Sequence, residues 1–63
     1  MTLNDLFEIT TDRQKLRINA DWRRYSGYWY EDHMLELLSR YKNHKVDITV
    51  ETSDMVAATV RRY

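Results

Sequence analysis

Alternation of apolar and polar residues over the last third of the chain limits its fold more than any other feature. Apolar side chains recur at every second position on both sides of a short polar break, Thr52-Ser53-Asp54. The apolar positions are Val46, Ile48, Val50, Val56, Ala58 and Val60. A period of two on each side of a turn predicts a β-hairpin with one buried face.

The turn of this hairpin decides which side chains meet across it. If Ser53 is the centre of a three-residue loop, Val50 lies opposite Val56 and the apolar residues share one face. A two-residue turn at Ser53-Asp54 would place Val50 opposite Ala57, on the other face. We therefore expect the three-residue loop, with Asp54 in the left-handed backbone conformation.

The first part of the chain predicts a helix and then a strand. Residues 2–9 suit a short helix with Thr2 as N-cap and Asp5 completing a capping box. From Lys15 to Arg24 apolar and polar residues alternate, which predicts a strand with one core face. That face would carry Leu16, Ile18, Ala20 and Trp22.

The only strong turn dipeptide is Ser26-Gly27, which contains the one glycine of the chain. A short strand over Tyr28–Tyr30 would then complete a first hairpin. With a two-residue turn, Trp29 lies on the same face as Trp22. With a three-residue turn centred on Ser26, Tyr28 and Tyr30 lie on that face and Trp29 points away. Both registers leave aromatic surface on the face away from the core.

A second helix is predicted from about His33 to Tyr41, with Asp32 as its N-cap and Asn43 in a left-handed conformation after its end. Glu36 is expected to pair with Arg40 on its solvated face. The order helix, strand, strand, helix, strand, strand predicts a single α+β domain over residues 1–63. We expect a four-stranded, mainly antiparallel sheet with one or two helices on one face.

Composition excludes several classes of function. Ten basic and ten acidic residues cancel, which argues against a polybasic nucleic-acid tail and against a protein that binds anionic membranes. The chain has no cysteine, and therefore neither disulfides nor thiolate metal ligands. No apolar run is long enough for a membrane span or a secretory signal, so we expect a cytoplasmic protein without a membrane partner.

Catalytic and metal-binding patterns are missing from the sequence. Asp32, His33 and Glu36 lie close together, but their spacing matches no standard zinc site, and N-capping and a solvated helix face account for the two carboxylates. No nucleophile and base can be paired. We therefore expect no catalytic residues, no metal and no cofactor, and a function other than that of an enzyme.

The strongest functional signal is an arginine–aromatic cluster in the first hairpin. It comprises Arg17, Arg23, Arg24, Tyr25, Tyr28, Trp29 and Tyr30. Arginine, tyrosine and tryptophan dominate protein–protein hot spots, which predicts a protein-binding surface. The same residue types on an exposed sheet also bind single-stranded nucleic acid, although the acidic residues interspersed here weaken that alternative. Plain packing of arginine stems over aromatic rings is the third interpretation.

Self-association is a further alternative, because the aromatic face would serve as the interface of a homodimer. A dimer would also relieve the small core of so short a chain. No proline blocks the strands at the sheet edges, so edge pairing is a second route to a dimer.

Two segments carry a resemblance to known proteins. The chain opens with Met1-Thr2-Leu3-Asn4-Asp5-Leu6-Phe7, of the type M-[TS]-L-x-D-L-F, and Lys45-Val46-Asp47-Ile48-Thr49-Val50 follows K-V-x-x-I-x-V with a spacing one residue shorter. This layout resembles small uncharacterised proteins of bacteriophages and mobile elements of Gram-positive bacteria, from which Tyr25–Tyr30 departs. The resemblance implies a stoichiometric inhibitor of a host enzyme or defence system, anti-CRISPR proteins among them, and assigns no catalytic residues.

Overall fold

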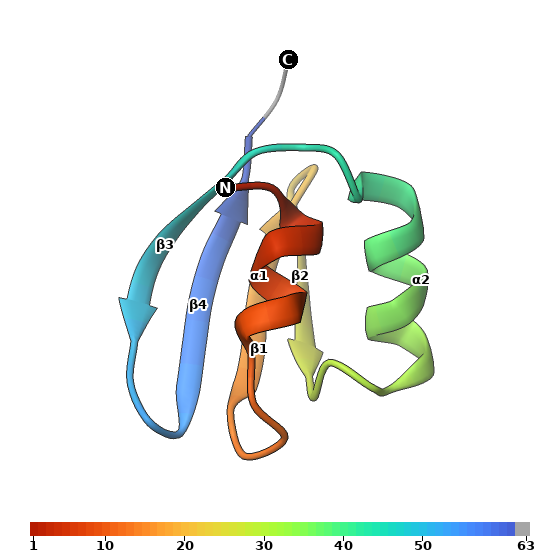
Figure 1. The fold of residues 1–63 in the computed structure, drawn as a ribbon. Coiled ribbons are helices and arrows are strands. Elements are labelled where there is room, and N and C mark those ends of the chain that lie inside the picture. The colour runs from red at the N-terminus through yellow and green to blue at the C-terminus, as the bar shows by residue number, and fades with distance from the viewer. Residues whose placement is uncertain (62–63) are drawn as a thin grey trace.

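The computed structural model describes residues 1–61, which form two helices and one four-stranded sheet (Figure 1). The elements in chain order are α1 (Leu3–Ile9), β1 (Lys15–Ala20), β2 (Arg23–Gly27), α2 (Asp32–Tyr41), β3 (Val46–Glu51) and β4 (Met55–Val60). The predicted α+β class and the predicted order of elements are confirmed.

The sheet is mixed, with strand order β2-β1-β4-β3. Each hairpin is antiparallel, whereas the two inner strands, β1 and β4, pair in parallel. Parallel strands need a long connection, and α2 supplies part of it on the way from β2 at one edge to β3 at the other. The sheet is therefore mainly antiparallel, as expected, but not throughout.

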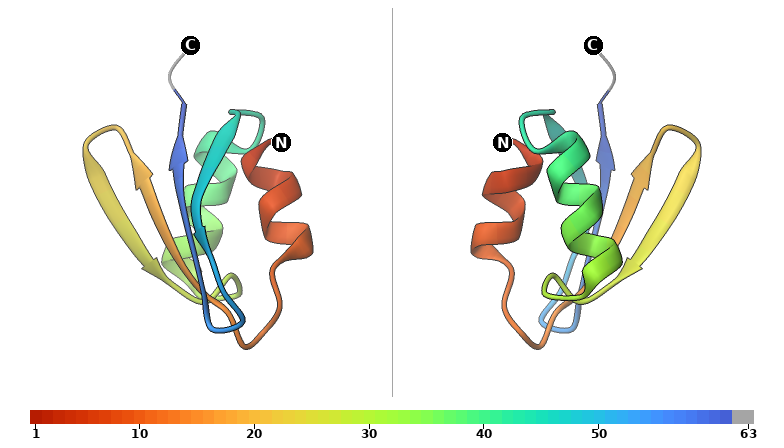
Figure 2. Two further views of the ribbon diagram at one scale, coloured as in Figure 1. Left: turned by 90° about the vertical axis from the view of Figure 1, so that its left-hand side faces the viewer. Right: turned by 90° about the vertical axis from the view of Figure 1, so that its right-hand side faces the viewer.

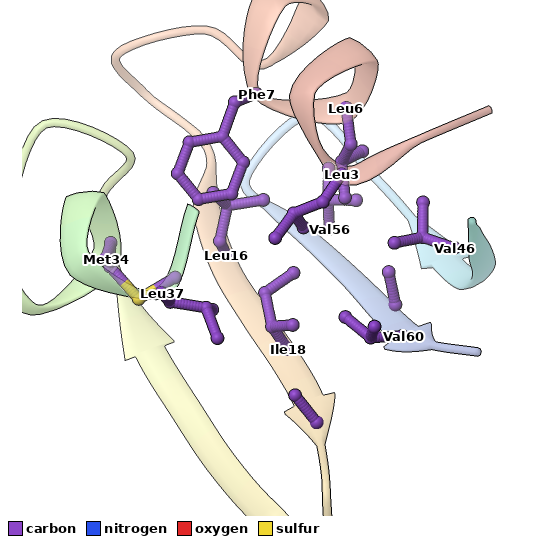
Figure 3. Packing of buried hydrophobic residues seen from close by; sticks show 12 residues of the cluster. Leu3, Leu6, Phe7, Leu16, Ile18, Met34, Leu37, Val46, Val56 and Val60 are labelled. Carbon is purple, nitrogen blue, oxygen red and sulfur yellow. The ribbon is translucent and has the colours of Figure 1, made fainter. Parts of the chain in front are cut away.

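Both helices lie over the same face of the sheet (Figures 1 and 2). The core between the two layers contains aliphatic side chains from every strand except β2, together with one aromatic ring (Figure 3). Its members are Leu3, Leu6, Phe7, Leu16, Ile18, Ala20, Met34, Leu37, Val46, Val56, Ala58 and Val60. Each large buried side chain contributes roughly 1.5–3 kcal/mol, so these few residues account for much of the stability.

The opposite side of the sheet, here called the outer face, is covered by neither helix. Alternation along the strands and the register between them place ten side chains on it. They are Lys15, Arg17, Asn19, Arg24, Ser26, Asp47, Val50, Met55, Ala57 and Thr59.

The start of α1 forms as the sequence predicts. Thr2 accepts a hydrogen bond from the Asp5 N–H at 3.2 Å, and the Asp5 carboxylate accepts one from the Thr2 N–H at 3.0 Å. The hydrogen bond from the Thr2 N–H to the carboxylate lowers the pKa of Asp5. The same terminal segment lies along β3, where Val46 N–H donates to the Met1 carbonyl at 3.0 Å. The capping box therefore also orders the stretch that covers this end of the sheet edge.

The second helix begins one residue earlier than predicted. Its N-cap is Glu31, and Asp32, the expected N-cap, is its first helical residue. The Glu31 side chain makes no cap bond to the helix and instead accepts from the Tyr28 N–H at 2.5 Å. Asn43 does not adopt the expected left-handed conformation.

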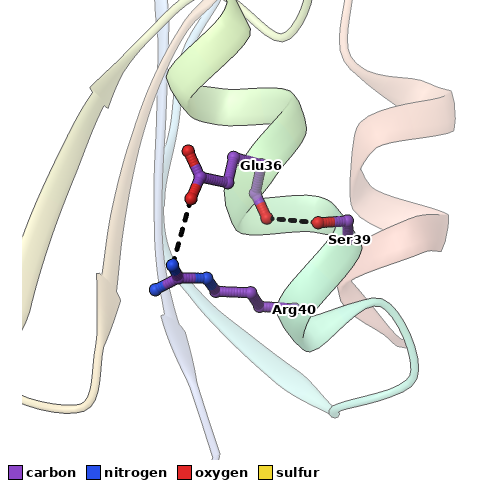
Figure 4. Close-up of polar contacts among 3 residues, drawn as sticks. All are labelled: Glu36, Ser39 and Arg40. Carbon is purple, nitrogen blue, oxygen red and sulfur yellow. Dashed lines mark hydrogen bonds and ion pairs between the residues drawn. The ribbon is translucent and has the colours of Figure 1, made fainter.

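The exposed side of α2 carries the predicted ion pair. Arg40 Nη2 lies 3.0 Å from Glu36 Oε1, and Ser39 Oγ donates to the Glu36 carbonyl at 2.7 Å (Figure 4). Both charged side chains remain largely solvated. The pair is therefore a minor contribution to stability.

The predicted register of the C-terminal hairpin is confirmed at its open end, where Val46 pairs with Val60 and Ile48 with Ala58. An irregularity between Ile48 and Val50 then shifts the pairing. Val50 lies opposite Ala57 instead of Val56 and is 42% exposed, so its predicted place in the core is wrong. The extra residue at this β-bulge is Thr49, whose hydroxyl donates to the Ala57 carbonyl at 3.1 Å.

The loop of this hairpin has the expected three residues between its strands, but Asp54 is not left-handed. Thr52 explains why. Its hydroxyl accepts from the Met55 N–H at 3.0 Å and from the Asp54 N–H at 3.3 Å, while its own N–H donates to the Met55 carbonyl at 2.8 Å. A side chain that bonds the turn backbone in this way removes the need for a left-handed residue.

The first hairpin differs most from prediction. Its turn is Asp21-Trp22, closed by the pair Ala20–Arg23, and both turn residues have positive φ, at 48° and 68°. Positive φ at both central positions is the pattern of a type I′ turn, whose twist matches that of a β-hairpin. The predicted turn at Ser26-Gly27 and the predicted core position of Trp22 are therefore wrong.

Gly27 ends β2 and does not form the turn. Its φ is 149°, and a Cβ there would approach Glu31 Oε2 to within 2.3 Å and His33 Nε2 to 2.7 Å. The expected strand at Tyr28–Tyr30 is wrong, because these residues connect β2 to α2. Glycine is required here because the chain must pass beneath two side chains from the start of the next helix.

Candidate functional site

The seven residues of the predicted arginine–aromatic cluster lie in three different places. Arg17 and Arg24 project from the outer face, whereas Arg23 and Tyr25 belong to the helix side of β2. The three aromatic residues at 28–30 lie in the connection between β2 and α2. The structure therefore does not bring the cluster together as one surface.

On the helix side of β2, Tyr25 is half-buried and packs against the core. Arg23 is exposed beside it, at the rim of a small hollow of about 190 Å³ between β2 and α2. Its lining also includes His33, Glu36, Leu37 and Arg40. Packing is the simplest account of Tyr25 in this position.

The connection between β2 and α2 is ordered by contacts among its own aromatic rings. Tyr28 and Tyr30 stack with ring centres 5.7 Å apart, and Trp29 meets Tyr30 edge to face at 5.6 Å. The Trp29 indole packs against the core and donates from Nε1 to Asp12 at 2.9 Å. Tyr30 retains half of its surface in solvent, so Trp29 has a packing role and Tyr30 remains accessible.

The outer face has a shallow hollow, here called the outer hollow, across β2, β1 and β4. Its first part, of about 360 Å³, is lined by Arg17, Arg24, Ser26 and Ala57, among others. A second part, of about 420 Å³, continues from Asn19 and Arg24 to the turn and to Thr59 and Val60. Its lining combines the small side chains of Ser26 and Ala57 with arginines.

Charge is unevenly distributed on a chain whose formal net charge is zero. Within residues 1–61, Lys15, Arg17 and Arg24 of the outer face form no ion pair. The acidic residue on this face is Asp47, which accepts two hydrogen bonds from Arg61 at 2.6 and 2.7 Å. These bonds lower the pKa of Asp47, so its charge is matched locally and the outer face remains basic.

Acidic residues concentrate on the other layer of the molecule. Asp5 and Glu8 belong to α1, and Asp32 and Glu36 belong to α2. The helix layer therefore carries several acidic side chains, one of them paired with Arg40, whereas Arg17 and Arg24 of the outer face form no ion pair within residues 1–61. A basic surface is present although the composition is neutral.

Trp22 is the most prominent apolar side chain of the surface, with 91% of its area exposed. It occupies the tip of the β1–β2 hairpin and borders the outer hollow. Its neighbour Asp21 accepts a hydrogen bond from the Tyr41 hydroxyl at 2.5 Å, which raises the pKa of Tyr41 and ties the turn to the end of α2. Trp22 is thus presented on an anchored turn.

Trp22 is not a member of the arginine–aromatic cluster that the sequence predicts. One signal could have identified its position, because aspartate tolerates the left-handed conformation that the first residue of a type I′ turn needs. A strand ending at Ala20 would then have placed Arg23 and Tyr25 on the helix side.

Both edges of the sheet carry obstructions to pairing with another strand. Along β3, Leu3 N–H donates to the His44 carbonyl at 2.9 Å, so the terminal segment occupies the start of the edge before the bulge distorts it. Along β2, His33 Nε2 lies 2.6 Å from the Ser26 carbonyl oxygen. These features occupy part of each edge and so hinder the addition of another strand.

Among residues 1–61, no group of three or more histidine, aspartate or glutamate side chains could hold a metal ion. In the same stretch, no helix has the length and apolar character needed to cross a membrane. Comparison with known proteins finds no matching family model, no matching curated protein and no matching solved structure.

Proposed function

We propose that this chain is a non-enzymatic protein-binding module that contacts an acidic surface of its partner. The contact residues are Arg17 and Arg24 of the outer hollow, with Trp22 at its end. The observation that supports the proposal most strongly is the basic, uncovered sheet face beside an exposed tryptophan. Arg23, Tyr25 and the aromatic residues at 28–30 have supporting roles.

The chemistry of the outer hollow favours carboxylates. An arginine without an ion pair presents a planar fork of donors that binds a carboxylate through two parallel hydrogen bonds. Complementary charge also steers the approach of a partner and selects against basic surfaces. A tryptophan beside two arginines combines the residue types that carry most of the energy in protein interfaces.

A protein partner is favoured over nucleic acid by the placement of the aromatic rings. Single strands bind where successive bases stack on aromatic side chains. Here Tyr25 turns toward the helices, and the rings at 28–30 lie beyond the end of β2 that is farther from Trp22. Nucleic acid remains the second candidate because the charge of the outer face suits phosphates as well as carboxylates.

The resemblance to phage and mobile-element proteins suggests a more specific version of the proposal. In that version the module is a stoichiometric inhibitor of a host protein or defence system, of the anti-CRISPR kind. A small domain that binds without chemistry acts by occupying a surface of its target. Inhibition should then follow a 1:1 titration and stop when the target is saturated.

The test is an affinity capture from bacterial lysate by the tagged chain, with and without nuclease. Arg17→Glu with Arg24→Glu reverses the charge of the outer hollow. Arg13→Glu is the matched control, because Arg13 is exposed in the connection between α1 and β1, where it forms no ion pair within residues 1–61. Circular dichroism checks that each variant is folded.

The proposal predicts that one protein is captured in stoichiometric amount and that nuclease does not reduce its capture. The Arg13→Glu control should capture the same protein, and the double variant should not. Capture that is equal for the control and the double variant would refute the outer hollow as the site. Loss of the captured material on nuclease treatment would transfer the assignment to nucleic acid.

A further inference from the structure

A second concave surface, here called the helix groove, lies between α1 and α2 on the side opposite to the outer hollow. It has a volume of about 300 Å³. Its lining residues are Asn4, Phe7, Glu8, Thr10, Asp12, Trp29, Leu35 and Leu38. The apolar members include Leu35, which is 41% exposed, and the charged members are both acidic. The groove is therefore suited to an apolar side chain with positive charge beside it.

The tip of the β1–β2 hairpin carries this combination of properties. Trp22 projects into solvent, and it is followed directly by Arg23 and Arg24, which form no ion pair within residues 1–61. Because successive side chains of a strand alternate, the two arginines flank the tryptophan on opposite faces of the hairpin. The tip thus presents an apolar side chain with Arg23 and Arg24 beside it, opposite in charge to Glu8 and Asp12 of the helix groove.

A chain cannot place this tip in its own groove. Trp29 of the groove follows the end of β2, whereas Trp22 precedes its beginning, so the two sites are separated by the length of a five-residue strand. At about 3.3 Å per residue this length is roughly 16 Å. The hairpin also splays away from α1 (Figure 2). The groove that the tip can enter belongs to another molecule.

We propose that the chain associates head to tail, with Trp22 of one copy inserted in the helix groove of the next. Arg23 and Arg24 of the first copy then face Glu8 and Asp12 of the second. The two contact surfaces are different, so a copy bound through one of them can bind a further copy through the other. Association proceeds beyond two copies unless a ring closes. The contact is small, which makes it weak and reversible.

The test uses two variants that each retain one half of the contact. Trp22→Gly removes the tip and leaves the groove intact, and glycine suits the positive φ of 68° at this position. Leu35→Lys places a long cation in the groove and leaves the tip intact. Leu35 is an exposed position of α2, where lysine is a good helix former. Circular dichroism establishes that both variants are folded.

Sedimentation velocity is measured for the unmodified chain, for each variant and for their equimolar mixture, up to about 1 mM, the range of weak interfaces. The proposal predicts that the average mass of the unmodified chain rises with concentration while each variant alone stays monomeric. It also predicts that the mixture forms a 1:1 complex and nothing larger, since one functional tip meets one functional groove.

Three results would overturn the proposal: an unmodified chain that stays monomeric, a Trp22→Gly variant that associates normally, or a mixture that stays monomeric although the unmodified chain associates. The inference shares Trp22 and Arg24 with the proposed partner contact, so the two tests are separated by their readout. Self-association is measured on the purified chain without a partner, and Leu35→Lys lies outside the proposed partner contact. A chain that self-associates but captures no partner contradicts the proposed function alone, and a chain that captures a partner but stays monomeric contradicts this inference alone.

Discussion

The two hairpins of this molecule reverse the direction of the chain with different kinds of turn. The β3–β4 turn uses the Thr52 side chain to bond its own backbone, and no residue in it has positive φ. The β1–β2 turn places two non-glycine residues at positive φ, one of them the large Trp22. A bulky residue in this conformation is strained, at a cost of order 1–3 kcal/mol.

The environments of the two turns suggest a reason for this difference. The β3–β4 turn presents small polar side chains and serves the fold. The β1–β2 turn projects an almost fully exposed tryptophan that adds nothing to the core. We propose that the strain at Trp22 serves binding, because the side chain that bears it lies outside the core. The comparison can be tested by changing each hairpin at its most characteristic residue.

The largest effect is expected at Gly27, at the far end of the first hairpin. Gly27→Ala should lower the free energy of unfolding by about 2–4 kcal/mol, because alanine is strained at φ 149° and its Cβ would displace Glu31 and His33 from their hydrogen bonds. Urea denaturation measures the change. A loss below about 0.5 kcal/mol, typical of an ordinary surface substitution, would contradict this account of Gly27.

An intermediate effect is expected at the turn of the second hairpin. Thr52→Ala removes the hydroxyl that bonds the N–H groups of Asp54 and Met55, and should destabilise the fold by about 1 kcal/mol. Ser53→Ala is the matched control in the same loop and should have little effect. Equal thermal shifts for the two variants would show that the hydroxyl of Thr52 does not close the turn.

A smaller effect with a characteristic pH dependence is expected at Tyr41. Its hydroxyl donates to Asp21, and this hydrogen bond raises the pKa of Tyr41 in the folded state above its ordinary value of 10.0. The bond therefore contributes fully below pH 10, and its contribution is lost as the pH rises through the raised pKa.

Tyr41→Phe should lower stability slightly at neutral pH and have no effect once tyrosine is ionised. Thermal unfolding of both proteins across this alkaline range measures the difference. A gap between the two melting temperatures that does not narrow at high pH would exclude the hydrogen bond as its cause.

The sequence predicted the second hairpin better than the first because its local signals agree with the fold. Alternation from Val46 to Val60 identifies both strands and most of their pairs. The bulge at Thr49 has no comparable signal in the sequence, because the alternation of apolar and polar residues continues through it without a break. Val50 was consequently assigned to the wrong face.

In the first hairpin the local signals point to the wrong structure. Alternation continues through Ala20 to Trp22, so the pattern marks no end of the strand at Ala20. Ser26-Gly27 is a favourable turn sequence that the fold does not use as a turn. Local preference alone does not identify a strained turn of Asp21 and Trp22. Because the turn is predicted at the wrong place, the sequence assigns Trp22 to the core and Tyr25 to the binding surface.

The candidate site was predictable only in part for the same reason. Arg17 lies on the strand face that alternation assigns to solvent, and the structure confirms that position. The basic character of the outer face depends on the pairing of β1 with β4 and on the helices that gather the acidic residues on the other layer. Composition and spacing do not contain this information.

The most direct test of the central claim is to measure stability and association together in the Trp22→Gly variant. If Trp22 is strained at its positive φ and has no role in the core, glycine relieves the strain and the variant should be about 1 kcal/mol more stable than the unmodified chain. It should also lose self-association and bind partners more weakly. A variant that is less stable, or that associates as before, would contradict the account and assign Trp22 to the fold.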